Sequence, residues 1–174
     1  MNRLEQITLQ VFQLLGRLPL NRILRVRNSR DFAAYFKDFE KIEAVKRIFG
    51  EKTAEVLQNL KVDLIWFSGY MYVDCSTGHL VISARYLKTG NKVDVYLDII
   101  HELYHVKQLM EGQNLFDPQY SYVKRPTEIE AYLYTVQEAR RLGLSDERIC
   151  EYLKTEWMSD RDLKVLAKAV NVRC

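Results

Sequence analysis

The chain contains the segment His101-Glu102-Leu103-Tyr104-His105, an HExxH pattern whose residue types and spacing suit a metal site. Residues four apart on an α-helix lie on the same face. His101 and His105 can therefore reach one ion, each through a zinc–nitrogen bond of about 2.0–2.1 Å. Glu102, next to the first histidine, can take a proton from a water held by that ion. The pattern predicts two metal ligands and a general base.

Apolar residues surround this pattern, and they indicate that its helix is buried. They are Val95, Leu97, Ile99 and Ile100 before it, and Val106, Leu109 and Met110 after it. A helix that is apolar on nearly every side is mostly buried, and buried imidazoles and carboxylates need partners. A metal is a suitable partner, so we prefer a metal site to an exposed helix face that carries two histidines by chance.

A catalytic zinc usually takes three protein ligands and leaves one position for water. No histidine follows His105, and His79 lies between a turn and a strand, where we expect a strand-edge role. Two glutamates compete for the third position, Glu128 and Glu130. Thr127 and Glu130 have the form of a capping box, which would give Glu130 a structural task. We therefore predict Glu128 as the third ligand, with Glu130 as the alternative.

The elements that must position these residues can be read from periodicity and turn signals, and they predict an α+β fold. Three strands rich in β-branched and aromatic residues are expected to form a small antiparallel sheet: Val62–Trp66, Tyr70–Val73 and Leu80–Ala84. Helices are expected over 3–17, 30–49, 53–60, 91–111 and 127–143, with two more after the N-caps Ser145 and Ser159. A loop over 113–125 precedes the glutamate helix.

These elements suggest a division of the chain into three parts. Residues 1–60 form an N-terminal helical segment, 61–144 a core that holds the site, and 145–174 a C-terminal helical segment. A chain of 174 residues with 48% hydrophobic content can bury such a core.

Charge and cysteine content bear on partners and compartment. The net charge is +3, and arginines gather in the first thirty residues, but no recognition motif accompanies them, so we expect no nucleic-acid partner. No signal peptide or apolar run of about 18 residues is found, so no membrane span is expected. Cys75, Cys150 and Cys174 are odd in number and form no CxxC, which favours free thiols in a reducing compartment. We predict a cytoplasmic protein.

With these residues in place, residues 62–143 resemble the gluzincin metallopeptidases and, in small size, the archaeal minigluzincins. The resemblance implies a zincin-like core in which an HExxH helix packs on a glutamate helix below a small sheet. It implies zinc bound by His101, His105 and Glu128, with Glu102 as general base. It also implies a peptide or protein substrate aligned on an edge strand, for which Leu80–Ala84 is the candidate.

The chain departs from the larger gluzincins at two places. Those proteins often carry an aspartate on the glutamate helix that supports a ligand histidine, and this chain has Tyr132 there. Another group must then hold the imidazoles, and the candidates are Asp98, Glu130 and a backbone carbonyl. No spare histidine can stabilise an oxyanion, so that donor is expected from the loop before the glutamate helix, at Tyr120, Tyr122 or Arg125.

The preferred function is thus a zinc-dependent metallopeptidase. The alternative is a regulatory or sensing protein on the same fold with weak or no proteolysis, and the basic N-terminal arm favours it. A purely structural site is disfavoured because structural zinc sites are usually cysteine-rich.

We also predict latency. The helices at 3–17 and 30–49 have apolar faces that must be covered, either by the core or by a second copy of the chain. The second case would make the protein a homodimer. We expect one of the outer segments, residues 1–60 or 145–174, from the same chain or a neighbouring copy, to lie over the cleft and keep activity low.

Overall fold

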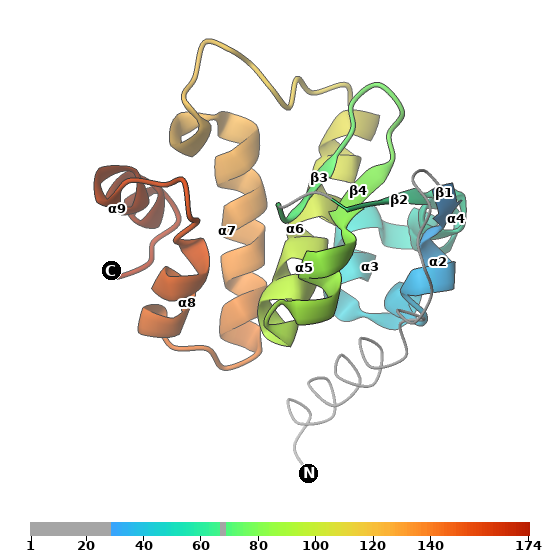
Figure 1. The fold of residues 1–174 in the computed structure, drawn as a ribbon, viewed down its shortest axis with the longest axis horizontal. Coiled ribbons are helices and arrows are strands. Elements are labelled where there is room, and N and C mark those ends of the chain that lie inside the picture. Colours follow the sequence, from blue (N-terminus) through green and yellow to red (C-terminus); the bar gives the residue numbers. More distant parts are fainter. Residues whose placement is uncertain (1–28, 67–68) are drawn as a thin grey trace.

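The computed structural model describes residues 29–66 and 69–174, and these form an α+β fold around a four-stranded sheet (Figure 1). The strands follow the order β1-β2-β4-β3 across the sheet. Their bounds are β1 Ser29–Asp31, β2 Lys61–Ile65, β3 Met71–Val73 and β4 Leu80–Ser83. The short strand β1 falls where the sequence predicted the start of a helix.

The sheet is mixed, so the prediction of an antiparallel sheet is wrong. Strand β2 runs parallel to β4, whereas the β1–β2 and β3–β4 pairs are antiparallel. Strand β4 is inserted between β2 and β3, and all four of its residues are buried. Its run Leu80-Val81-Ile82 is apolar on both faces, which suits a central strand.

Because β4 is central, it cannot be the edge strand that the sequence suggested. The edge on this side of the sheet is β3, and no other strand among the described residues pairs with its outer side. Helix α6 packs against β3. The free edge of the sheet therefore lies next to the HExxH helix.

The prediction of one helix over 30–49 is also wrong. The segment contains α2 (Phe32–Tyr35), a 3-10 turn at Phe39–Lys41 and α3 (Glu43–Phe49). Asp38 has a left-handed backbone with φ of 65°, which interrupts the helix before the turn. The rings of Phe32 and Phe39 meet edge to face at 5.5 Å, so close aromatic packing replaces a continuous helix face. Helix α4 (Thr53–Asn59) agrees with prediction to one residue.

Two long helices carry the HExxH pattern and the glutamate segment, and they lie side by side (Figure 1). The first is α6 (Lys92–Met110), which follows the short helix α5 (Ala84–Thr89). Asn91 caps α6, as predicted, by accepting hydrogen bonds from the amides of the second and third helical residues. The second is α7 (Pro126–Arg141), preceded by a 3-10 turn at Tyr122–Lys124. Pro126 occupies the first turn of α7, where it loses no hydrogen bond.

Helices α8 (Asp146–Leu153) and α9 (Asp160–Ala169) lie beside α7 (Figure 1), and α8 also contacts the first half of α6, where the Tyr152 hydroxyl donates to Asp98 at 2.8 Å. Ser145 and Ser159 cap them as predicted, each by accepting a hydrogen bond from an amide in the first turn. Buried apolar residues from the described parts of all three predicted segments belong to one core cluster, which extends from Phe32 to Val172.

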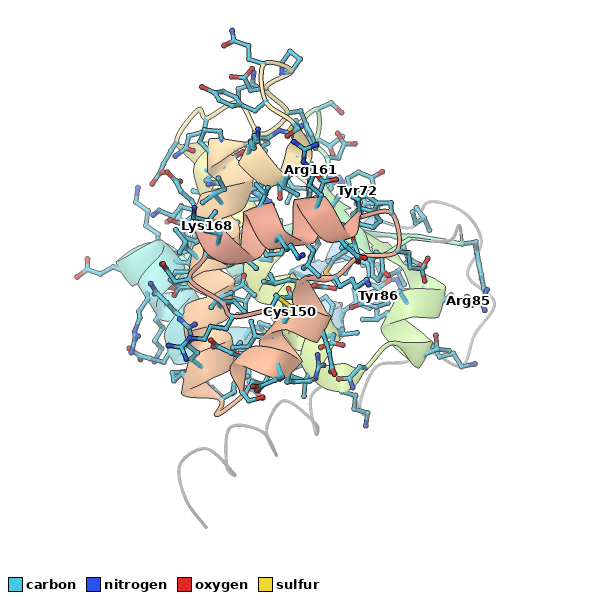
Figure 2. The ribbon with its side chains drawn as sticks, turned by 90° about the vertical axis from the view of Figure 1, so that its left-hand side faces the viewer. Tyr72, Arg85, Tyr86, Cys150, Arg161 and Lys168 are labelled. Atoms are coloured by element: carbon cyan, nitrogen blue, oxygen red, sulfur yellow. A yellow bond between two sulfur atoms is a disulfide. The ribbon has the colours of Figure 1, made fainter. Side chains whose placement is uncertain are left out.

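A disulfide joins Cys150 in α8 to Cys174 at the end of the chain, with 5.4 Å between the Cα atoms (Figure 2). The prediction of free thiols is therefore wrong for these two cysteines, and only Cys75 is free in the described residues. The two residues are 24 positions apart and meet because α9 turns the chain back, which no spacing rule reveals. The cytoplasmic location stays a prediction, without the support of its cysteine argument.

Within residues 29–66 and 69–174, every helix is too short or too polar to cross a membrane. The helix predicted over 3–17 lies outside the described residues.

Candidate metal centre

The side chains of His101, His105 and Glu128 converge between α6 and α7. The Nε2 atoms of the two histidines are 2.9 Å apart, and Oε2 of Glu128 lies 3.4 Å from each of them. The three atoms form a nearly equilateral triangle, close enough to hold one metal ion. The structure thus brings together all three residues that the sequence proposed as ligands.

The size of this triangle fits a small tetrahedral ion. Ligand atoms about 2.0–2.1 Å from such an ion lie roughly 3.3 Å from one another. The observed separations of 2.9 and 3.4 Å bracket that value. Glu128 Oε2 is buried and has no hydrogen-bond partner in residues 29–66 and 69–174, although a carboxylate oxygen seldom stays unpaired away from water. The donor set and the unpaired oxygen together fit a bound cation.

The electrostatics of the triangle also favour a positive charge. Burial alone raises the pKa of the Glu128 carboxyl, but the two neighbouring imidazoles reverse this and hold it well below its usual range. Burial lowers the pKa of His105, yet the carboxylates of Glu128 and Glu102 outweigh burial and raise it to about 9. Burial and the adjacent His105 lower the pKa of His101. An ionised carboxylate between two imidazoles therefore attracts one cation, either a proton or a metal.

Gln108 fixes the tautomer of His105. Its side-chain nitrogen donates to the carbonyl of Thr127 and to Glu130 Oε2, both at 3.0 Å. Its oxygen must then be the atom that faces His105 Nδ1, at 2.7 Å, and that nitrogen must carry the hydrogen. In neutral His105 the lone pair is consequently on Nε2, the atom in the triangle.

This arrangement corrects the predicted role of Thr127 and Glu130. Helix α7 begins before Thr127, with Arg125 as N-cap residue and no side-chain capping bond, so no capping box forms. Thr127 Oγ1 instead donates to the carbonyl of Leu115, and Glu130 accepts from Gln108. Glu130 thus supports His105 through Gln108, as one of the candidates to hold the imidazoles. Sequence reasoning missed Gln108, although it lies one turn after His105 on the same helix face.

On its Nδ1 side, His101 is held by packing rather than by a hydrogen bond. Its Nδ1 is buried without a partner among the described residues. The ring of Tyr132 packs against it with 4.3 Å between centroids. Tyr132, which stands where larger gluzincins carry an aspartate, therefore fixes the ring by contact alone.

Glu102 lies beside the triangle, at the edge of the sheet. It is 7% exposed, the backbone amide of Val73 donates a hydrogen bond to its carboxylate, and its Oε2 has no hydrogen-bond partner in the part of the chain that the structure describes. Burial raises its pKa to about 8, so without a nearby cation the group holds a proton at neutral pH. A divalent cation in the triangle would favour the ionised form. Glu102 can therefore accept or release a proton near neutral pH.

The triangle opens into a cavity of about 230 Å³ that runs along β3. Its wall includes His101, Glu102, His105 and Glu128 together with Met71, Tyr72 and Val73 of the strand. Three large aromatic side chains in the wall, Tyr72, Phe116 and Trp157, are about half or more exposed. Their arrangement gives the cavity an aromatic rim.

Other residues singled out from the sequence have different positions. His79 contacts Asp63 at 3.0 Å in the sheet, which confirms its strand-edge role. Asp98 accepts hydrogen bonds from two tyrosines and holds neither imidazole. Arg125 lies 3.5 Å from Glu128 Oε1, so it steadies the oxygen that is outside the triangle. Tyr120 is 43% exposed and lines neither cavity at the site.

Tyr122 is the loop residue that reaches the site. Its side chain is in the cavity wall, and its hydroxyl lies 2.8 Å from that of Tyr132. Of the three predicted oxyanion donors, Tyr122 is the one that the structure places at the cavity with a hydroxyl.

Comparisons with protein-family models, curated proteins and solved structures found no match. The gluzincin family therefore stays a resemblance, and any function must be inferred from the geometry of the chain's own residues.

Replacing Gln108 by alanine should weaken metal binding by about 10–100-fold, the usual effect of losing a group that orients a ligand histidine. The change frees His105 to rotate and to take the other tautomer. A competition titration with a metal chelator measures this loss. Gln119→Ala, on the exposed loop, is the matched control and should bind metal as the wild type does. Unchanged affinity in the Gln108 variant would show that His105 needs no support.

Proposed function

We propose that this protein is a zinc-dependent metallopeptidase with a zincin-like core. One observation carries the proposal: the buried triangle of His101, His105 and Glu128 lies beside Glu102 and opens along the free edge of β3. Two imidazoles and one carboxylate are a typical catalytic zinc set. For this reason we propose zinc as the metal that this site binds.

The free edge of β3 offers a place for an extended peptide. The carbonyl of Tyr70 and the amide of Asp74 bond towards β4. Backbone groups alternate in direction along a strand, so those of Met71 and Val73 point to the free edge. The amide of Val73 meets Glu102, and the groups of Met71 remain for a peptide added as a strand. A substrate aligned there would run past Glu102.

The residues divide the chemistry among themselves. Zinc, when bound, supplies Lewis acidity that lowers the pKa of a water molecule to about 7 and polarises a carbonyl. Glu102 Oε2 takes the proton of the attacking water and passes it to the leaving amine. The Tyr122 hydroxyl, held by Tyr132, donates a hydrogen bond to the oxygen on which charge develops. Arg125 keeps Glu128 turned towards the triangle.

The regulatory alternative depends on the basic arm in the first thirty residues, of which 1–28 lie outside the described residues, and it stays a prediction. The C-terminal segment contributes Trp157 to the wall of the metal cavity. This contact is consistent with a restraint on access, so latency also stays a prediction, as does a homodimer.

The proposal predicts one zinc per chain and peptide cleavage that depends on it. Metal content should be measured after zinc loading and dialysis, and cleavage with a mixed peptide library before and after chelation. His105→Ala should lose the zinc and the cleavage, whereas the matched control His79→Ala should keep both, because His79 lies in the sheet away from the triangle. Equal zinc in His105→Ala and wild type would overturn the metal site, and a zinc-loaded wild type that cleaves nothing would overturn the peptidase.

A further inference from the structure

A second cavity, of about 170 Å³, also has His101 and Glu102 in its wall. It shares Met71, Tyr122 and Trp157 with the metal cavity, so the two spaces adjoin at Glu102. The rest of its wall comes from Tyr70 before β3, from α5, the first half of α6, Tyr132 of α7, α8 and the α8–α9 connection. A cavity of about 150 Å³ can admit benzene. The space is therefore large enough for one side chain of a peptide.

Two carboxylates in this wall have no cationic partner among residues 29–66 and 69–174. Asp98 accepts hydrogen bonds from the hydroxyls of Tyr86 at 2.5 Å and Tyr152 at 2.8 Å, and both donors are neutral. Glu151 lies on the α8 side of the cavity. Within the described residues, no lysine or arginine forms an ion pair with Asp98 or Glu151. The cavity therefore carries uncompensated negative charge.

The remaining charges in the wall are compensated elsewhere. Asp94 forms an ion pair with Arg148, and Lys154 pairs with Asp160 at 3.1 Å. Burial raises the pKa of Asp98 to about 6, so the group is still ionised at neutral pH. The charge that a ligand would meet is negative.

Buried polar atoms without partners mark the side of the cavity next to the metal. Glu102 Oε2 and His101 Nδ1 both lack a hydrogen-bond partner among the described residues, and their side chains are at least nine-tenths buried. Unpaired buried groups of this kind indicate a site that a ligand or water completes. The wall of this cavity therefore contains both the acidic residues and two groups of the proposed catalytic site, His101 and Glu102.

Aromatic rings form a further part of the wall. Tyr70 meets Tyr86 edge to face at 4.8 Å and Trp157 at 5.8 Å. Trp157 is 62% exposed, so much of its ring is open to a ligand. Figure 2 views the α8 and α9 side of the molecule and labels Tyr86 on α5. Ring faces next to carboxylates are the usual surroundings of a bound ammonium or guanidinium group.

We propose that this cavity is the specificity pocket of the site and takes the cationic side chain, lysine or arginine, of the substrate residue next to the bond that is cut. This inference rests on the proposed peptidase function, because it assumes that the bound side chain belongs to a peptide substrate. The aliphatic part of such a side chain would lie along Tyr70 and Trp157, and its charged end would reach Asp98 and Glu151.

Binding of capped amino acids to the zinc-loaded protein tests the pocket without any need for turnover. Nα-acetyl-lysine amide should bind about tenfold or more tightly than Nα-acetyl-norleucine amide, because only the first carries the cation. Norleucine amide with a free amino group places its charge on the main chain, and it should gain no such advantage. Calorimetry gives the three dissociation constants.

Variants of the cavity wall test whether its carboxylates cause the preference for lysine over norleucine. Asp98→Asn combined with Glu151→Gln should reduce the lysine advantage to about onefold, since both changes keep side-chain size and remove charge. Glu147→Gln, an exposed change in the first turn of α8, should leave the advantage intact. If the double variant does not fold, Glu151→Gln alone should still reduce the advantage measurably, because this side chain lies at the surface.

The outcomes separate this inference from the proposed function. Equal binding of the lysine and norleucine compounds, or tighter binding of the free-amine compound, overturns the pocket. Cleavage of peptides with no preference for lysine or arginine next to the cut overturns it as well. A chain that binds the lysine compound selectively but cleaves no peptide would overturn the peptidase and keep the pocket.

Discussion

Glu102→Gln is expected to keep zinc and the fold while peptide hydrolysis falls by about 10²–10⁴-fold, the usual range for loss of a general base. Glutamine has the shape of glutamate and can still accept the hydrogen bond from the Val73 amide. It cannot take a proton from water. The buried carboxyl already favours its protonated form when no cation is near, so the neutral amide should not destabilise the fold.

The measurement is peptide cleavage at matched zinc content, with thermal unfolding as a check of the fold. Glu111→Gln, at the exposed end of the same helix, is the matched control and should be as active as the wild type. If the Glu102 variant cleaves as fast as the wild type, another group is the base and the proposed division of chemistry is wrong.

The part of the site that the sequence predicted best depends on local spacing. His101, Glu102 and His105 lie within five residues of one helix, so their relative positions follow from helix geometry alone. The N-cap Asn91 of this helix and the apolar residues around the HExxH pattern are local signals too. The α+β class and the positions of α4, α6, α8 and α9 could be predicted for the same reason.

The choice of Glu128 shows how a residue can be selected by an argument that the structure contradicts. Glu130 was expected to cap its own helix, but α7 begins two residues too early for that, with Arg125 rather than Thr127 as N-cap, and Glu130 instead accepts a hydrogen bond from Gln108 across the helix pair. Glu128 reaches the triangle because it lies in the first turn of α7, facing α6.

Features that depend on distant contacts could not be predicted from spacing. The place of β4 between β2 and β3 is decided by how the sheet assembles. Because of this order, the free edge belongs to β3 and not to the predicted strand Leu80–Ala84. The Cys150–Cys174 disulfide depends on the return of the chain after α9. Trp157 reaches the site from the C-terminal segment only because α8 and α9 fold back beside α7.

A second large effect is expected at Glu128. Its Oε2 is one corner of the triangle, so Glu128→Ala should weaken zinc binding by more than about 100-fold, beyond the loss usual for a group that only orients a ligand. Glu130→Ala removes an acceptor of Gln108, which keeps the carbonyl of Thr127, so its effect should be about tenfold or less. The two variants are matched controls for each other, since they lie two residues apart on one helix.

Chelator competition gives the affinities, and thermal unfolding with and without zinc gives an independent measure. Zinc stabilises the folded state in proportion to the logarithm of its concentration over its dissociation constant, so a 100-fold weaker site loses about 2.7 kcal/mol of that stabilisation. This loss should appear in Glu128→Ala and be about half as large, or smaller, in Glu130→Ala. The reverse order would make Glu130 the ligand, and it would require α7 to turn from the position in which Gln108 connects Glu130 to His105. Because Gln108 is buried and is hydrogen-bonded to His105, the Thr127 carbonyl and Glu130, we expect the loss of zinc affinity to be larger in Glu128→Ala than in Glu130→Ala.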